Sequence, residues 1–175
     1  MSRWWMKAST GGLGLALILA IGGLAQAQPN NATINANATV LQPVTVVAQS
    51  DLDFGNVFPG VNKSVTLTDA GAGGWYVTGV TGAEVDLSLT VPLNLDSGGN
   101  NLPIVFGAAD AGYNTANDPS SATGFDPGVG ATTNLSGAAL GDLWVWIGGQ
   151  VQPATNQPAG FYTGTITLTV DYTGN

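Results

Sequence analysis

The segment GFYTGTITLTVDY, from Gly160 to Tyr172, constrains the fold more than any other part of the sequence, because its apolar and polar residues alternate almost without error. One side carries Ile166, Leu168, Val170 and Tyr172, and the other carries Thr165, Thr167, Thr169 and Asp171. A period of two is that of a β-strand with one buried face. The backbone of such a strand must pair with another strand or remain an open edge.

Further period-two segments, separated by Gly, Pro and Asn turn signals, predict a series of strands. These are Thr33–Leu41, Val44–Ala48, Leu52–Gly55, Lys63–Thr68, Trp75–Val80, Glu84–Val91, Leu102–Phe106, Leu143–Ile147 and Tyr162–Tyr172. No segment shows a convincing helical stripe. Roughly seven to nine short strands predict an all-β fold, an antiparallel immunoglobulin-like sandwich of two sheets. A jelly roll is the alternative.

Alternation also indicates which side chains face the interior of that sandwich, although it does not fix the order of the strands. The expected core consists of Phe54, Val65, Leu67, Trp75, Val77, Val85, Leu87, Leu89, Ile166, Leu168 and Val170.

The N-terminus has the pattern of a secretory signal peptide. Arg3 and Lys7 precede an apolar run from Leu13 to Leu24, and Ala25-Gln26-Ala27 forms a small-x-small cleavage site. An uncleaved membrane anchor is the alternative, but the apolar run is shorter than the ~20 residues that a spanning helix needs. We therefore expect a signal peptide over residues 1–27, a single exported domain over 28–175, and no membrane insertion after cleavage. The expected location is the bacterial periplasm and cell surface.

The charge of the exported chain restricts its partners. Loss of Arg3 and Lys7 would leave Lys63 as the single base against eleven acidic residues, and would move the net charge from −8 to about −10. Such a surface repels phosphate backbones and anionic lipids, which argues against binding of nucleic acid. The absence of cysteine excludes stabilising disulfides.

The same composition excludes most catalytic mechanisms. The chain has no His and no Cys, so Ser-His-Asp and Cys-His nucleophiles and imidazole or thiolate metal ligands are ruled out. Asp96-Ser97-Gly98 matches the aspartic-protease triplet only once, where two copies are needed, and is read as a turn. Glu84 and Asp86 could approach glycosidase spacing, but their alternation indicates a solvated strand face. No catalytic residue, cofactor or enzyme activity is predicted.

Residues 107–141 form a long Gly-, Asn- and Asp-rich segment, which we expect to be a partly ordered surface loop with one short strand near Gly130–Leu135. Its oxygen-bearing side chains Asp110, Asn114, Asn117, Asp118 and Asp126 could bind calcium, but their spacing is not that of an EF-hand. An ordinary polar loop is favoured and no metal site is predicted.

Aromatic residues offer a second type of site. Trp75 is expected in the core. Trp144 and Trp146 share one face of a strand whose other face is also apolar, so this pair could pack internally or contact a glycan or another subunit.

Two motifs carry a resemblance to known families. The closing segment, with Gly160 and the near-terminal Tyr172, resembles the last strand of archaic chaperone–usher pilins, the spore-coat-U-like subunits. The run ATVLQPVTVVAQSDLDFGNVFPG, from Ala38 to Gly60, is similar to the opening of the domain-of-unknown-function family numbered 4402. That family also closes on a Gly-Tyr-Thr-Gly-Thr strand, like the segment Gly160–Thr165.

The pilin resemblance implies a structural surface subunit that polymerises by strand exchange. It implies an assembly edge at Gly160, Tyr162, Gly164, Ile166, Leu168, Val170 and Tyr172. It implies a donor strand within Gln28–Val40, with Ile34, Ala36, Ala38 and Val40 on one face. The implied partners are other copies or other surface subunits, a periplasmic chaperone and an outer-membrane usher. The alternative is a self-complete secreted binding module, adhesin-like, for a glycan or a protein.

Overall fold

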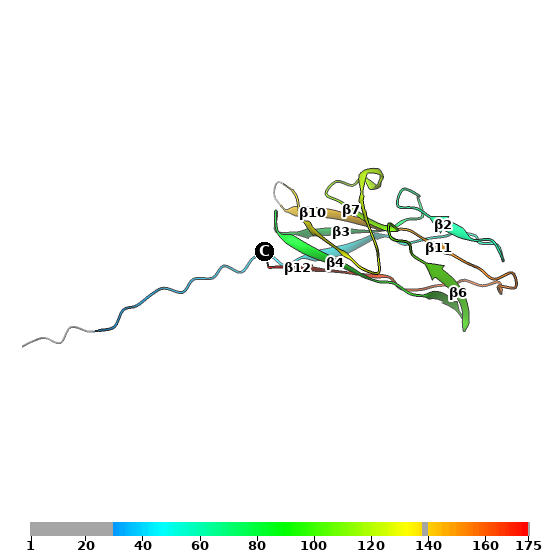
Figure 1. Ribbon diagram of the computed structural model, residues 1–175, viewed down its shortest axis with the longest axis horizontal. Helices are drawn as coiled ribbons and strands as arrows, with labels where there is room; N and C mark the ends of the chain where they lie inside the picture. The colour runs from blue at the N-terminus through cyan, green and yellow to red at the C-terminus, as the bar shows by residue number, and fades with distance from the viewer. Residues whose placement is uncertain (1–29, 138–139, 175) are drawn as a thin grey trace, which may run out of the picture. The chain divides into compact units, whose positions relative to one another are not determined.

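The computed structural model describes residues 30–137 and 140–174 of the chain, and the predicted signal peptide lies outside them. Every regular element in the described part is a β-strand, apart from one short 3-10 helix (Figure 1). All strand pairs are antiparallel. The prediction of an all-β antiparallel sandwich is therefore confirmed.

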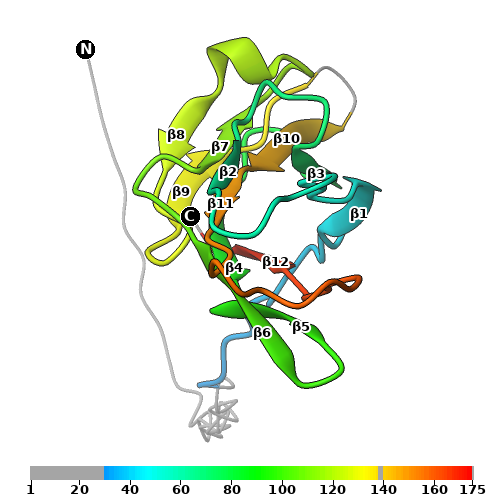
Figure 2. The same ribbon diagram turned by 90° about the vertical axis from the view of Figure 1, so that its right-hand side faces the viewer.

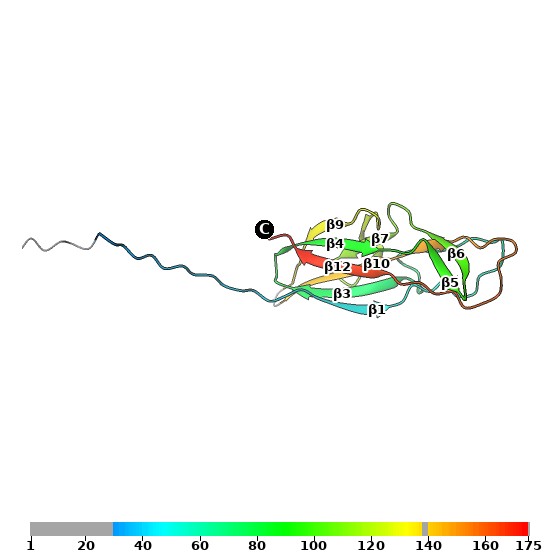
Figure 3. The same ribbon diagram turned by 90° about the horizontal axis from the view of Figure 1, so that it is seen from below.

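The elements in chain order are β1 (Thr45–Ser50), β2 (Lys63–Val65), β3 (Gly73–Gly79), β4 (Glu84–Thr90), β5 (Asn94–Ser97), β6 (Asn100–Val105), β7 (Ala111–Asn114), the 3-10 helix η1 (Pro119–Ser121), β8 (Thr123–Phe125), β9 (Ala131–Asn134), β10 (Gly141–Ile147), β11 (Gly149–Val151) and β12 (Thr167–Tyr172). Hydrogen bonds join them into three sheets, of order β1-β3-β10-β7-β8, β2-β11-β6-β5 and β12-β4-β9. Figure 3 shows β3, β4 and β12 in one half of the sandwich along its length and β5 and β6 in the other half.

Three sheets form where two were expected, because two long strands are interrupted by residues that break the ladder. Gly148 separates β10 from β11, and a Cβ on Gly148 would overlap the carbonyl oxygen of Val65. Pro92 lies between β4 and β5 and has no N–H to donate. Each interrupted strand passes from a sheet in one half of the sandwich to a sheet in the other half.

Several predicted strands differ from those observed. No strand is assigned to Thr33–Leu41 or to Leu52–Gly55. The last strand begins at Thr167, and the residues before it make only one isolated bridge, between Thr163 and Asp96. Alternation alone predicted these strands, but a strand also needs a continuous hydrogen-bonded ladder, and Asp53 and Thr163 make only isolated backbone hydrogen bonds to other segments.

The short strand expected near Gly130–Leu135 is present as β9, but the expectation that the rest of residues 107–141 is loop is wrong, because this segment also contains β7, η1 and β8. Each of β7 and β8 has a single large apolar residue, Tyr113 and Phe125, and Gly112 pairs directly with Gly124. A Cβ on Gly112 would overlap a methyl group of Leu67, so glycine permits the loop before β3 to cover this part of the sheet. One large apolar residue per strand makes no alternating pattern, which is why the sequence did not predict β7 and β8.

The sandwich contains two apolar clusters. The larger one, the main core, lies between the five-stranded and three-stranded sheets and includes Val77, Leu87, Leu143, Leu168 and Val170. The smaller one, the second core, includes Phe54, Val65, Leu102, Ile104 and Val151. Seven of the predicted core residues are buried, namely Phe54, Val65, Val77, Val85, Leu87, Leu168 and Val170, whereas Leu67, Trp75, Leu89 and Ile166 are half-buried.

Candidate functional site: an apolar groove

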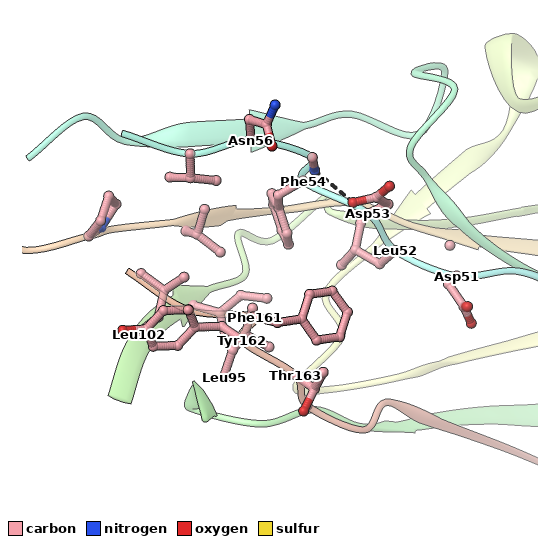
Figure 4. Close-up of a pocket in the computed structure, with 18 of the residues that line it drawn as sticks. Asp51, Leu52, Asp53, Phe54, Asn56, Leu95, Leu102, Phe161, Tyr162 and Thr163 are labelled. Carbon is pink, nitrogen blue, oxygen red and sulfur yellow. Dashed lines mark hydrogen bonds between the residues drawn. The ribbon is translucent and has the colours of Figure 1, made fainter. Parts of the chain in front are cut away.

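The second core is open on one side, where it forms a groove with a volume of about 1090 Å³. One wall consists of residues 50–59 and the other of residues 157–164. The floor is formed by Leu102, Ile104 and Val151, from strands β6 and β11. Leu52 and Phe54 lie opposite Phe161 and Tyr162 across the gap (Figure 4). The groove is therefore lined mainly by apolar side chains.

The first wall is held by hydrogen bonds around Asp53. The amide of Asp53 donates to the carbonyl of Gly71 at 2.8 Å, and its carboxylate accepts from the amide of Gly55 at 2.7 Å. Gly55 has a φ of 58°, which favours glycine there. This turn places Phe54 inward, 7% exposed. The Leu-Asp-Phe-Gly run thus forms a wall of the groove and is not a strand.

The second wall is fixed through Tyr162 and Thr163. The Tyr162 hydroxyl accepts from Gln157 Nε2 and donates to the Pro158 carbonyl, both at 2.8 Å. Thr163 and Asp96 exchange two backbone hydrogen bonds, of 2.8 and 2.9 Å. These contacts hold the wall in place although it belongs to no sheet.

Two phenylalanines that line the groove are largely exposed. Phe58 is 72% exposed and Phe161 is 85% exposed. Exposing a Phe ring to water forgoes roughly 1.5–3 kcal/mol of burial free energy. A strand lying in the groove would cover both rings.

The groove ends next to two open sheet edges, because its lining includes Ala48 and Ser50 of β1 and Ile166, the residue directly before β12. β1 is the edge strand of the five-stranded sheet and β12 is the edge strand of the three-stranded sheet. Viewed along the strands, both lie on the same side of the sandwich (Figure 2). No described strand pairs with the outer side of either.

The backbone groups at the open edge of β12 follow from its pairing with β4. The amide of Thr173 donates to the carbonyl of Glu84 at 3.1 Å. Hydrogen-bonded pairs alternate in an antiparallel ladder, so Asp171, Thr169 and Thr167 also bond to β4. The N–H and C=O groups of Leu168, Val170 and Tyr172 therefore point to the open side. These same residues turn their side chains into the sandwich.

The residues predicted as an assembly edge divide between two places. Gly160, Tyr162, Gly164 and Ile166 line the groove. Leu168 and Val170 belong to the main core, and Tyr172 packs against it. The predicted donor residues Ile34, Ala36, Ala38 and Val40 lie in a segment that forms no strand, and Ile34 and Val40 are 93% and 95% exposed.

The outer face of the five-stranded sheet carries the other predicted contact residues. Trp146 is buried, whereas Trp144 is half-buried and its ring centroid lies 4.5 Å from that of Tyr76 on the neighbouring strand. The Tyr76 hydroxyl donates to Asp142 Oδ1 at 2.6 Å, and this bond raises the pKa of Tyr76 above its usual value. Trp75 packs against the main core and also lines the groove.

The carboxylates considered in the sequence make local hydrogen bonds. Asp96 accepts from the amide of Gly99 at 3.1 Å in the β5–β6 turn, as a turn aspartate does. Asp86 accepts from the Thr132 hydroxyl, and Glu84 from the Thr173 hydroxyl.

In the segment 107–141, Asp110, Asp118 and Asp126 each accept from a backbone amide within three residues. No group of three or more acidic residues that could hold a metal ion occurs among residues 30–137 and 140–174. Each of these three aspartates therefore caps a local turn.

The pilin resemblance implied only the wall of the groove at Gly160–Ile166, and the rest of its lining was not predicted because it comes from segments far apart in the chain. Residues 50–59, 95–104 and 157–166 carry no common motif. The signal that could have indicated it is the pair of large apolar residues in turn-rich segments, Phe58 next to Pro59 and Phe161 next to Gly160.

The fold and groove define the chain as an antiparallel β-sandwich whose second core is open beside two unpaired sheet edges. Residues 44–172 match the family described as a domain of unknown function, DUF4402, so the chain belongs to this family. Among curated proteins, no sequence matches the chain. None of the helices in the described residues is long and apolar enough to cross a membrane.

Proposed function

We propose that the chain is a secreted, non-enzymatic structural protein of a bacterial surface, a pilin-like subunit that assembles by β-strand complementation. The observation that carries this proposal is the apolar groove of about 1090 Å³, whose lining extends to Ile166, directly before the C-terminal strand with its free edge. An added strand would satisfy the open backbone groups and cover the exposed rings of Phe58 and Phe161. The incomplete second core is thereby completed by another chain.

The open edge of β12 also indicates which partners the subunit needs. An open strand in a secreted protein without cysteine is a liability for aggregation. A periplasmic chaperone would cover the groove until an outer-membrane usher replaces it with a strand of another subunit. The strongly acidic surface keeps such subunits apart until the groove is filled.

A charge placed in the groove tests this function. Ile166 is half-buried and lines the groove, so Ile166→Asp should prevent an apolar strand from entering. Its neighbour Thr167 is exposed and points outward, so Thr167→Asp is the matched control. We expect the Ile166 variant to remain a folded monomer in light scattering, and the control to assemble like wild type. Assembly of both variants would refute the proposal.

A self-complete binding module is the second candidate function. The observation that favours it is the Tyr76–Trp144 pair beside Asp142 on the outer face of the five-stranded sheet. An aromatic platform next to a carboxylate is suited to a sugar ring. Glycan binding that is lost in Trp144→Ala, while the protein remains monomeric, would favour this candidate over assembly.

A further inference from the structure

The outer face of the five-stranded sheet carries a row of side chains that crosses four strands. Its members, each paired in register with the next, are Val47 on β1, Tyr76 on β3, Trp144 on β10 and Asn114 on β7. Residues paired in this way point to the same face. Val145, next to Trp144 in the chain, is fully buried in the main core, so the row faces outward. Neighbouring strands lie about 4.8 Å apart, so this outer row is roughly 14 Å long.

The exposed aromatic surface of this face belongs to Tyr76 and Trp144, and not to the pair Trp144 and Trp146 expected from the sequence. Tyr76 and Trp144 are half-buried, whereas Trp146 is 8% exposed. The register partners of Trp146 are Gly74 and Gly112, and a Cβ on Gly74 would lie 3.5 Å from its Cδ1. Glycine thus lets the Trp146 ring lie against the sheet.

The adjacent row on the same face supplies polar groups. It consists of Thr45, Thr78 and Asp142, again paired in register. Asp142 Oδ1 accepts from the Tyr76 hydroxyl at 2.6 Å, and Oδ2 has no hydrogen-bond partner among the residues that the structure describes. Asp142 is also the single charged residue of the two rows. The outer row is therefore bordered by two hydroxyls and a carboxylate oxygen that can bond to a ligand.

The side chains of the outer row are held in place before any ligand arrives. The ring centroids of Tyr76 and Trp144 are 4.5 Å apart, with an angle of 34° between the ring planes. The Asn114 amide donates to the carbonyl of Asp118 and the hydroxyl of Ser121, at 3.2 and 2.8 Å. A ligand that binds fixed side chains pays less conformational entropy than one that must order them.

The chemistry of the two rows favours a neutral sugar chain. A pyranose ring whose hydroxyls are all equatorial has two apolar C–H faces and a polar rim, which match an apolar row with a polar border. An anionic glycan is repelled by Asp142 and by the acidic chain as a whole. The apolar surface of a protein would leave the Asp142 carboxylate buried and incompletely bonded.

A cation fits this surface less well than a neutral sugar. Aromatic rings bind a cation over their faces. Tyr76 and Trp144 each cover one face of the other, so the two rings do not enclose a cation between them.

We propose that the outer row binds a neutral, linear glycan of β-1,4-linked pyranoses, with one sugar on the exposed side of Trp144 and its hydroxyls bonded to Asp142 and Thr78. The glycan crosses the strands, toward Val47 on one side and Asn114 on the other. This inference goes beyond assembly, because none of these residues lines the groove. Assembled subunits each present one such site, so a long glycan gains avidity from several of them.

Titration calorimetry with cellohexaose on the exported chain tests this inference. Trp144→Ala removes the stacking ring, and Asp142→Ala removes the acceptor of a sugar hydroxyl. Each should weaken binding at least about tenfold, which is the loss expected for a hydrogen bond to a charged group. Asp171→Ala is the matched control, because this carboxylate is exposed on β12, in another sheet, and its removal should leave the Kd unchanged.

Three results would overturn the inference. They are no binding of cellohexaose, equal binding by all the variants, and tighter binding of the cationic glucosamine hexamer than of cellohexaose. Light scattering on the same samples separates the two proposals, since assembly without glycan binding refutes this inference alone. Should Trp144→Ala fail to melt cooperatively, Val47→Asp replaces it, because Val47 is 47% exposed at the end of the same row.

Discussion

The hydroxyl of Tyr172 donates a hydrogen bond to the carbonyl of Gln42 at 3.1 Å, and so joins the end of the last strand to the residues that precede the first. The same hydroxyl accepts from the amide of Val80 at 2.8 Å. A Cβ on Gly79 would overlap this oxygen, so glycine leaves the space that the hydroxyl occupies.

Tyr172→Phe should remove both hydrogen bonds and leave the Val80 amide without its partner. Loss of one partner of a part-buried bond costs about 1–3 kcal/mol. Urea unfolding measures the change. Tyr113→Phe is the control, because its hydroxyl makes no hydrogen bond within the described residues, and an equal loss in both variants would contradict the role assigned to Tyr172.

Leu168→Lys should destabilise the sandwich itself. Leu168 is 8% exposed in the main core, next to Val170, and an unpaired buried charge costs about 3–5 kcal/mol. We expect the variant to be absent from the assembled fraction because it does not fold. Thr169→Lys, on the exposed side of the same strand, should fold and assemble. Export and assembly of Leu168→Lys at wild-type levels would contradict the burial of this strand.

Gly130 and Gly82 form a matched pair for backbone strain. Both have positive φ, 87° and 79°, but a Cβ on Gly130 would overlap the carbonyl oxygen of Leu87, whereas nothing lies within 4 Å at Gly82. Gly82→Ala should lower the free energy of unfolding by about 1–2 kcal/mol, because alanine must adopt the left-handed conformation. Gly130→Ala should cost more, because β9 must also move away from β4. Equal melting temperatures for the two variants would refute this difference.

Asp118 should make stability depend on pH. The side chain of Ser120, followed by that of Ser121, donates to its carboxylate and lowers its pKa. Since the pKa is lower in the folded state, the contribution is complete above the unfolded value and is lost as pH falls through the folded one. Thermal unfolding from about pH 3 to pH 7 should therefore show a larger loss on acidification for wild type than for Asp118→Asn. An identical pH dependence would contradict this assignment.

The sequence predicted those parts of the fold in which large apolar residues alternate. The apolar faces of β3, β4, β10 and β12 follow from Val77, Leu87, Leu143 and Leu168, and all four are buried. The strands β7 and β8 could not be predicted, because Gly112 and Gly124 supply space and not hydrophobicity. Alternation could not predict the groove, since tertiary structure alone brings Phe54 and Tyr162 to its two sides; only the wall at Gly160–Ile166 was implied, by the pilin resemblance.

The state of assembly tests the central claim most directly. Light scattering on the exported chain, with and without residues 28–38, measures the mass in solution. We predict a ladder of multimers for the complete chain and a folded monomer for the shortened one, because the groove remains but the strand that fills it is lost. If both the complete and the shortened chain are monomers and have the same melting temperature, strand complementation is contradicted.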